Sequence, residues 1–348
     1  MYSRESLGFV PRIAARFPVF AGALKRGQDQ FRRNYGYELD FTRGWWTPPL
    51  SARDALKLEQ SQVEETLCLK GLVSLTDHDN IEAGVTLQSM NQYRCMPISS
   101  EWTVPFGDSF FHLGIHNLPK SQAHAAADVM KQFTADPKPA HIAPILEWLN
   151  SFPETMVILN HPCWDEKGIG AAKHAALLDQ FLAGHQVFFH AVELNGLRPW
   201  SENRQVVALS KRTGLPLISG GDRHAHEPNA NVNLTNASTF SEFVTEVREG
   251  HSTVLFMPQY HEPFRLRILH NLCDVLTTQE DHTEGWCLWS DRVFFELHDG
   301  RLKSLTDWFG DEGPIVVRYF VALMQQVKCR PMTSVLRFAL GQREEALT

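Results

Sequence analysis

The 348-residue sequence has few of the patterns that identify zinc-ribbon, disulfide-rich or membrane-spanning proteins. Its six cysteines are scattered, with no Cys-x-x-Cys pair and no repeated short spacing, so they predict neither a zinc ribbon nor a disulfide framework. No apolar run approaches the roughly 20 residues that a membrane-spanning helix needs. We therefore expect a cytoplasmic protein with no membrane partner.

Positive charge is also scarce. The formal net charge is −7, whereas proteins that bind nucleic acid use an excess of lysine and arginine to neutralise phosphates. Nucleic acid is therefore not expected as the main partner. A small phosphorylated or anionic ligand, held by a few local arginines, remains compatible with this charge, and the sequence gives no indication of an oligomeric state.

Between residues 35 and 256, short apolar runs alternate with amphipathic segments, which is typical of repeated βα units in an α/β fold. The predicted strands are 71–76, 93–99, 109–115, 156–160, 188–194, 215–219 and 252–256, and the predicted helices are 51–67, 121–133, 141–151, 173–183, 203–213 and 241–250. This periodicity fits either a closed barrel or an open doubly wound sheet. No Gly-x-Gly-x-x-Gly or Walker-type loop follows these strands, which favours the barrel over nucleotide-binding folds.

The flanking segments have a different composition. Residues 1–35 are rich in arginine and lysine around an apolar run at 17–24, and we interpret them as an amphipathic extension rather than a signal peptide. Residues 36–257 form the predicted barrel domain. Residues 258–348 form a mixed and helical C-terminal appendage, with a predicted hairpin at 292–305 turning at Asp299-Gly300 and a predicted helix at 314–326.

Side chains that bind protons or metals follow several of the apolar segments, and carboxyl ends of parallel strands meet at one edge of a sheet. Carboxylate and imidazole together are ligands for Zn, Mn or Fe. The Gly220-Gly221 pair also lets the chain turn tightly before its acidic and imidazole residues. The candidates are Asp77, His78 and Asp79 after the first predicted strand, Glu101, His112 and His116 within 109–116, His161, and Asp222 with His224.

These motifs resemble those of the polymerase and histidinol phosphatase (PHP) superfamily over about residues 38–230. The matching stretches are Thr76-Asp77-His78-Asp79, Glu101, His112-Leu113-Gly114, His161-Pro162, Val192-Glu193-Leu194-Asn195 and Gly221-Asp222-Arg223-His224. The resemblance implies a distorted (β/α)7 TIM-like barrel and a metal-dependent phosphoesterase. It also implies that Glu101 is the bridging carboxylate, that His112 and His161 complete one ion, that His78 and His224 belong to another ion or to the phosphate pocket, and that Asp222 sits on the remaining ion. Asp77 is a further candidate metal ligand.

One motif of that superfamily is absent. Its first strand normally carries a His-x-His pair, but Thr42 and Gly44 stand at those places, and no histidine precedes His78. We therefore expect one or two divalent ions, with one of the usual ions lost or weakly held. Arg43 could supply positive charge in the place of the lost ion. Arg198 and Arg223 are further candidates for binding an anion. Trp45 and Trp46 could form an aromatic wall for the substrate.

Three functions remain open on this reading. The first is hydrolysis of a small phosphorylated substrate by a metal-activated water, with His78 or His224 as proton donor and Arg43 or Arg223 neutralising charge. The second is a non-catalytic protein of the same fold that binds an anion or one metal ion. The third is a hydrolase of the amidohydrolase type acting on C–N bonds.

Overall fold

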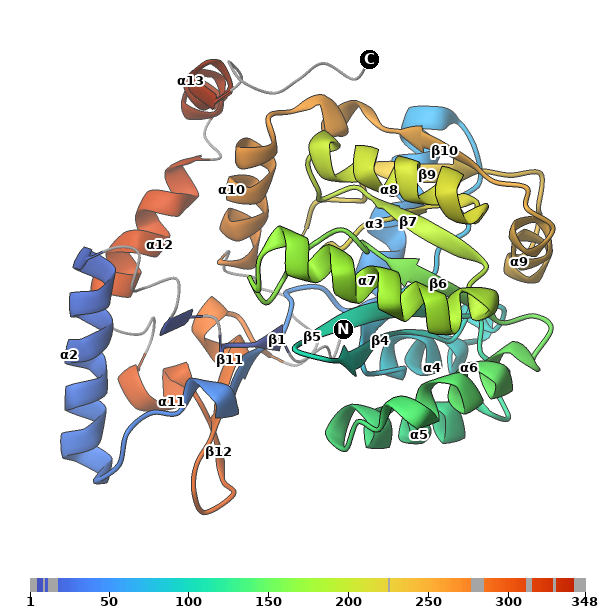
Figure 1. Cartoon of the computed structure of the whole chain (residues 1–348). Helices are drawn as coiled ribbons and strands as arrows, with labels where there is room; N and C mark the ends of the chain where they lie inside the picture. Colours follow the sequence, from blue (N-terminus) through green and yellow to red (C-terminus); the bar gives the residue numbers. More distant parts are fainter. Residues whose placement is uncertain are drawn as a thin grey trace. The chain divides into compact units, whose positions relative to one another are not determined.

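The computed structural model describes residues 5–8, 10–11, 18–224, 226–276, 285–310, 315–327 and 330–340 (Figure 1). Its contacts divide the chain into two compact units, each assembled from separate stretches of sequence. Unit 1 consists of residues 1–51, 224–226 and 269–335, and unit 2 of residues 52–223, 227–268 and 336–348. Part of the predicted N-terminal extension and the predicted helix start at Pro314 lie outside the described residues.

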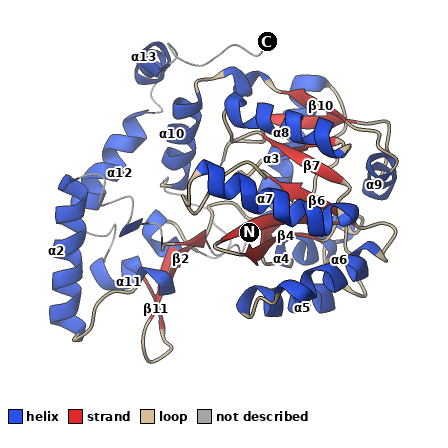
Figure 2. Ribbon diagram, in the orientation of Figure 1, coloured by secondary structure: helices blue, strands red, loops and turns tan. Residues whose placement is uncertain are grey.

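Unit 2 is built on a curled six-stranded sheet that resembles half of a barrel (Figure 2). Strand order follows the sequence, and the first and last strands form the edges. The neighbours are parallel except at the second and third junctions, which are antiparallel. The strands are β3 (Thr76–His78), β4 (Ser99–Phe106), β5 (Ser109–His116), β6 (Met156–Asn160), β7 (Ala191–Asn195) and β8 (Leu217–Gly220).

Alternation along these strands separates two faces of the sheet, because successive side chains point to opposite sides. One face carries apolar residues such as Trp102, Leu113 and Leu159, which pack against the helices that follow in sequence. These helices are α5 (Ala123–Ala135), α6 (Ile142–Asn150), α7 (Ala171–His185) and α8 (Trp200–Thr213). The opposite face of the strands receives the intervening polar residues, including Glu101 and His112.

The remaining elements of unit 2 complete its core. Helix α9 (Phe240–Arg248) packs its apolar face on Met156, Ile158 and Ile218, and α3 (Ala52–Leu67) packs on α4 (Glu82–Gln88). Gly214 ends α8 in the left-handed conformation, which favours glycine. Strands β9 (Asn231–Leu234) and β10 (Thr253–Phe256) form a separate antiparallel pair, which α10 (Phe264–Val275) follows.

The predicted helices are present within a few residues of the expected bounds, but the regular succession of βα units is not. Strand β4 begins at Ser99 rather than at residue 93, and it turns at Gly107-Asp108 into β5 to form an antiparallel hairpin. The predicted strand at 252–256 pairs with β9 instead of extending the main sheet. The described residues therefore give an open sheet of six strands, and seven βα units are not confirmed.

Unit 1 contains a four-stranded antiparallel sheet of order β1-β2-β11-β12. Its strands are β1 (Glu5–Ser6), β2 (Gly44–Trp46), β11 (Val293–Glu296) and β12 (Leu302–Ser304), and its helices include α2 (Pro18–Tyr35), α11 (Leu305–Phe309) and α12 (Ile315–Val327). Helix α13 (Arg330–Leu340) comes last in the chain. The β11–β12 hairpin and α12 agree with the predicted elements. None of the described helices combines the length and apolar character needed to cross a bilayer.

Candidate metal centre

Three side chains from neighbouring strands of unit 2 converge on the polar face of the sheet. Glu101 lies on β4, His112 lies on β5, and His161 directly follows β6. The register pairs Thr103 with His112 and His112 with Asn160, which brings the three side chains to one end of the sheet. Each of them is at most 6% exposed.

The ligand atoms of these residues form a nearly equilateral triangle. Glu101 Oε1 is 3.1 Å from His161 Nε2 and 3.5 Å from His112 Nδ1, and the two imidazole nitrogens are 3.3 Å apart. Ligand atoms held at about 2.1 Å from one divalent ion lie about 3.0 Å apart in an octahedral arrangement and about 3.4 Å apart in a tetrahedral one. The donor set and its spacing therefore fit one divalent metal ion.

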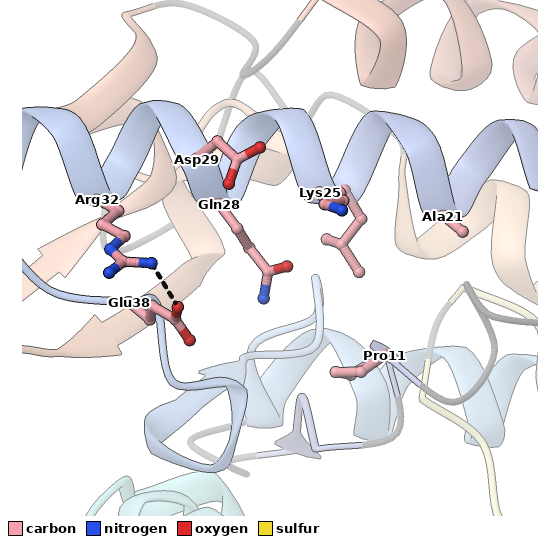
Figure 3. A pocket seen from close by; sticks show the side chains of 8 residues that line it. Pro11, Ala21, Lys25, Gln28, Asp29, Arg32 and Glu38 are labelled. Carbon is pink, nitrogen blue, oxygen red and sulfur yellow. Dashed lines mark hydrogen bonds and ion pairs between the residues drawn. The ribbon is translucent and has the colours of Figure 1, made fainter.

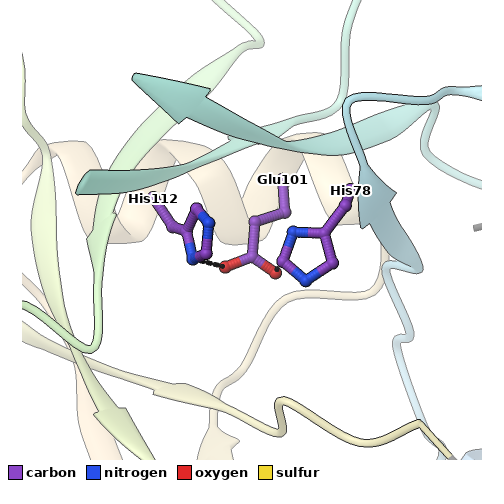
Figure 4. A group of neighbouring side chains, drawn as sticks. All are labelled: His78, Glu101 and His112. Atoms are coloured by element: carbon purple, nitrogen blue, oxygen red, sulfur yellow. Dashed lines mark ion pairs between the residues drawn. The ribbon is translucent and has the colours of Figure 1, made fainter. Parts of the chain in front are cut away.

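Glu101 also presents its second oxygen to another histidine. His78 Nδ1 lies 3.9 Å from Glu101 Oε2, and Figure 4 shows the carboxylate between the His78 and His112 rings. His78, Glu101 and His112 have ligand atoms within 4.8 Å of one another and could hold a metal ion. The alternation of β3 pairs His78 with Glu101 but Asp77 with Ser100, so Asp77 faces away from Glu101.

Electrostatics within the cluster follow from burial and charge. Burial by itself would raise the pKa of Glu101, but the His78, His161 and His112 rings outweigh it and hold the carboxyl ionised. Burial lowers the pKa of His112 to about 3. For His161, burial is outweighed by the hydrogen bond to Glu101 and by the charges of Asp222 and Glu193, which raise its pKa to about 9.

A buried glutamate holds the backbone of His161. Glu193 on β7 accepts the His161 backbone N–H at its Oε2 at 2.7 Å, and burial raises the pKa of Glu193 to about 7. His161 has a φ of +26°, and Asp79 and Asp222 at the ends of β3 and β8 also have positive φ. Such conformations cost of order 1–3 kcal/mol in non-glycine residues and persist where surrounding contacts enforce them.

Asp222, predicted as a metal ligand, is paired with an arginine. Its Oδ2 accepts a hydrogen bond from Arg198 Nη2 at 2.5 Å, and both side chains are buried. The Arg198 guanidinium also lies over the Trp164 ring, 3.2 Å from its centroid. The sequence pointed to Arg198 only as one of three possible anion-binding arginines, and its pairing with Asp222 was not expected.

Two other arginines singled out in the sequence also have protein partners. Arg43 donates from Nη2 to Glu296 Oε1 and to the Leu297 carbonyl oxygen, both at 2.9 Å, within unit 1. Arg223 forms an ion pair with Glu227 at 3.2 Å within unit 2. The expected roles of these arginines in charge neutralisation remain predictions.

The stretch that takes the place of the missing His-x-His motif belongs to unit 1. Thr42 donates both its N–H and its hydroxyl to Asp40, and Gly44 begins β2 opposite Phe295. A Cβ at Gly44 would lie 2.6 Å from the Phe295 ring, so a histidine cannot occupy this position without displacing that ring. The β2 strand pairs with β1 and β11 and is not a strand of the six-stranded sheet.

The remaining predicted contact residues also lie in unit 1. The Trp45 ring stacks on Phe294 with centroids 6.1 Å apart, and the Trp46 ring lies 6.3 Å from that of His224. An aromatic wall around a substrate therefore stays a prediction for both tryptophans, as does metal or phosphate binding for His224.

Further residues near the cluster were missed in the sequence. Glu166, in the loop after β6, places Oε2 3.9 Å from His112 Nδ1, and Asn160 Nδ2 donates to Glu101 Oε1 at 3.1 Å. Glu166 does not stand directly at the end of a strand, so no pattern marks it. Asn160 is a polar residue inside an apolar strand, and that unusual placement is a signal that could have identified it. Glu193 belongs to a stretch that the motif resemblance already included, but no role was assigned to it there.

A separate hollow of about 370 Å³ lies against α2 in unit 1 (Figure 3). Arg32 and Glu38 on its wall form an ion pair at 3.3 Å, but both side chains are more than half exposed. Exposed ion pairs of this kind contribute little stability and do not fix the positions of their side chains. The lining contains two carboxylates, Asp29 and Glu38, but no histidine or cysteine.

Comparison with known proteins gives a partial resemblance of the backbone. No protein-family model and no curated protein matches the chain. PsfC from Pseudomonas syringae PB-5123 is 12% identical, with 63% of this chain and 89% of that chain covered at a TM-score of 0.39. An amidohydrolase from Chromobacterium violaceum, solved with bound sulfate and no metal, is 13% identical, with coverages of 60% and 92% and a TM-score of 0.39.

Proposed function

We propose that Glu101, His112 and His161 hold a divalent metal ion and that the protein is a metal-dependent hydrolase. The observation that carries this proposal is the triangle of one carboxylate oxygen and two imidazole nitrogens with edges of 3.1, 3.3 and 3.5 Å. Three protein ligands leave positions open for water and substrate, as in catalytic metal sites. Zn, Mn and Fe all accept this donor set.

The proposed substrate is a small phosphorylated molecule. An ion in the site would act as a Lewis acid that lowers the pKa of a bound water and polarises a phosphoryl group. The chain itself would orient the ion through Glu101, which Asn160 holds by a hydrogen bond. His78, 19% exposed beside the other oxygen of Glu101, would deliver a proton to the leaving oxygen.

Two alternatives use the same residues. A non-catalytic protein that binds an anion or one ion is favoured by the pairing of Asp222 with Arg198 and by the threonine and glycine in place of the His-x-His pair. A hydrolase of C–N bonds would use the same ligand set. Turnover of phosphate esters, of amides, or of neither separates the three functions.

The test compares ligand variants with matched surface variants. Glu101→Gln and His161→Ala should each lower metal affinity by more than about 100-fold, because loss of even an outer partner of a metal ligand costs about 10–100-fold. They should also abolish phosphate-ester hydrolysis. The controls are Glu154→Gln and His141→Ala, which change exposed residues of the same types. Metal content is measured by mass spectrometry of the purified protein, together with turnover on a phosphate-ester panel.

An unchanged metal content in Glu101→Gln and His161→Ala would remove the metal centre from the proposal. An intact metal content without turnover of any phosphate ester would move the assignment to one of the two alternatives. Thermal stabilisation by inorganic phosphate in the absence of turnover would then favour the binding protein.

A further inference from the structure

The carboxylate at the end of β8 is already neutralised by a cation that belongs to the chain. Asp222 and Arg198 meet at 2.5 Å with side chains that are 6% and 10% exposed. A charge buried to this extent needs a partner, because removing one member of such a pair leaves the other charge buried and unpaired. The pair is therefore a fixed part of the centre.

Several contacts fix the arginine in place. Its guanidinium lies on the Trp164 ring, and its carbonyl oxygen accepts hydrogen bonds from Tyr260 Oη at 3.1 Å and Arg267 Nη2 at 3.3 Å. The preceding residue is held as well, since Leu197 donates its N–H to Asn195 Oδ1 at 2.8 Å. The loop after β7 is thus organised to present Arg198 to Asp222.

The surroundings of Arg198 are acidic. Glu166, whose side chain is 38% exposed, and the half-buried Glu202 both respond to Arg198, whose charge lowers the pKa of each carboxyl against the rise that burial causes. Without Arg198, the negative charges of Asp222 and these two carboxyls would give this place a potential that attracts a cation. Arg198 supplies one full positive charge at this place.

We propose that Arg198 is a built-in cation that takes the place of a second metal ion. Its guanidinium keeps Asp222 out of metal coordination, so the chain binds a single ion at Glu101, His112 and His161. This inference rests on the proposed function, because it assumes an ion at those three residues. It also explains why Asp222 pairs with an arginine in a chain that lacks the His-x-His pair expected before His78.

The purified protein is first stripped of metal with a chelator, which is then removed. Bound Mn²⁺ per chain is then counted by equilibrium dialysis and electron paramagnetic resonance. The wild-type protein should bind one ion. Asp222→Asn should also bind one, with a Kd within about threefold of wild type, because Asp222 is not a ligand. Arg198→Gln should remove the positive charge that neutralises Asp222 and gain a second ion, whereas Arg198→Lys should stay at one because it keeps the charge.

Loss of the ion in Asp222→Asn would overturn the inference, and so would a count of one in folded Arg198→Gln. Circular dichroism monitors folding. If Arg198→Gln does not fold, the retention or loss of the ion in Asp222→Asn still decides the question. A failure of the proposed function gives a different result, because the ion would then persist in Glu101→Gln and His161→Ala.

Discussion

At the scale of single residues, Gly220 shows how closely the backbone approaches the centre. It ends β8 beside Glu193, and a Cβ at this position would lie 1.5 Å from Glu193 Oε1. The other oxygen of the same carboxyl accepts the His161 backbone N–H. A side chain at residue 220 would therefore disturb the group that holds a proposed metal ligand.

We predict that Gly220→Ala destabilises the protein by about 1–3 kcal/mol, the usual cost of overpacking a filled interior. Chemical denaturation with urea measures this change. Gly184→Ala is the matched control, because Gly184 lies in α7 with nothing within 4 Å of the added Cβ. That control should stabilise by about 0.5–1 kcal/mol. A neutral effect of Gly220→Ala would mean that Glu193 moves aside freely.

The residue identities at the centre were partly predictable. Glu101, His112 and His161 follow from motif resemblance, and their spacing in the structure fits one ion. The pairing of Asp222 was not predictable, since a carboxylate in Gly221-Asp222-Arg223 gives no sign that an arginine 24 residues earlier will reach it. Side-chain partners across a sheet depend on register and loop shape, which are set by tertiary packing.

At the scale of elements, the junction between β6 and β7 contains a histidine, His190, that is neutral in the folded protein near pH 7. His190 Nδ1 accepts the Val157 backbone N–H at 2.9 Å, and burial together with the charge of Arg248 lowers the pKa of His190 to about 4. Its unfolded pKa is about 6.5. The unfolded chain therefore binds more protons than the folded chain between these values, and stability is lost as the pH falls from 6.5 towards 4.

We predict that this histidine contributes about 1–3 kcal/mol to the acid sensitivity of the protein, with the upper value reduced because the ring is partly exposed. His190→Asn keeps an acceptor near the Nδ1 position without the proton uptake, so its stability should fall less between pH 6.5 and 4. Urea unfolding across this range checks the result. Burial also lowers the pKa of His116 to about 4, so part of the decrease in stability with falling pH should remain in His190→Asn. Parallel pH profiles for wild type and His190→Asn would contradict the assignment.

Helices were easier to predict than strands. The apolar periodicity of α5 to α8 marks one buried face, and Gly214 marks an end, so local sequence suffices. The β4–β5 hairpin was missed, although Gly107 with a φ of +57° provides the turn. An apolar strand has the same sequence pattern whether its neighbour runs parallel or antiparallel. The direction of pairing depends on which strand becomes its neighbour in the folded sheet.

At the scale of the whole molecule, unit 1 joins segments that are nearly 250 residues apart in the sequence. Strand β2 pairs with β11, with Trp46 opposite Val293. Arg292, which is 1% exposed, donates to the Thr47 carbonyl oxygen at 3.1 Å and to the Val275 carbonyl oxygen at 2.7 Å. One buried guanidinium thus ties β2, α10 and β11 together.

We predict that Arg292→Ala destabilises unit 1 by about 2–4 kcal/mol, because it removes the donor from one buried and one partly buried carbonyl group and opens a cavity. Thermal unfolding followed by tryptophan fluorescence measures the loss. Arg301→Ala, which removes an exposed ion pair with Asp299, should change stability by no more than about 0.5 kcal/mol. Equal effects of the two substitutions would show that the buried contacts of Arg292 are not needed.

The sequence by itself determined the α/β class, the places of the helices along the chain, and the residue types from which a metal centre could be built, because these depend on local periodicity and on side-chain chemistry. The tertiary structure alone decided that Glu101, His112 and His161 form a triangle of ligand atoms and that Asp222 pairs with Arg198. It also decided that β2, with Gly44 against Phe295, belongs to the antiparallel sheet of unit 1. These outcomes depend on strand register and on contacts between distant segments, which no local pattern encodes.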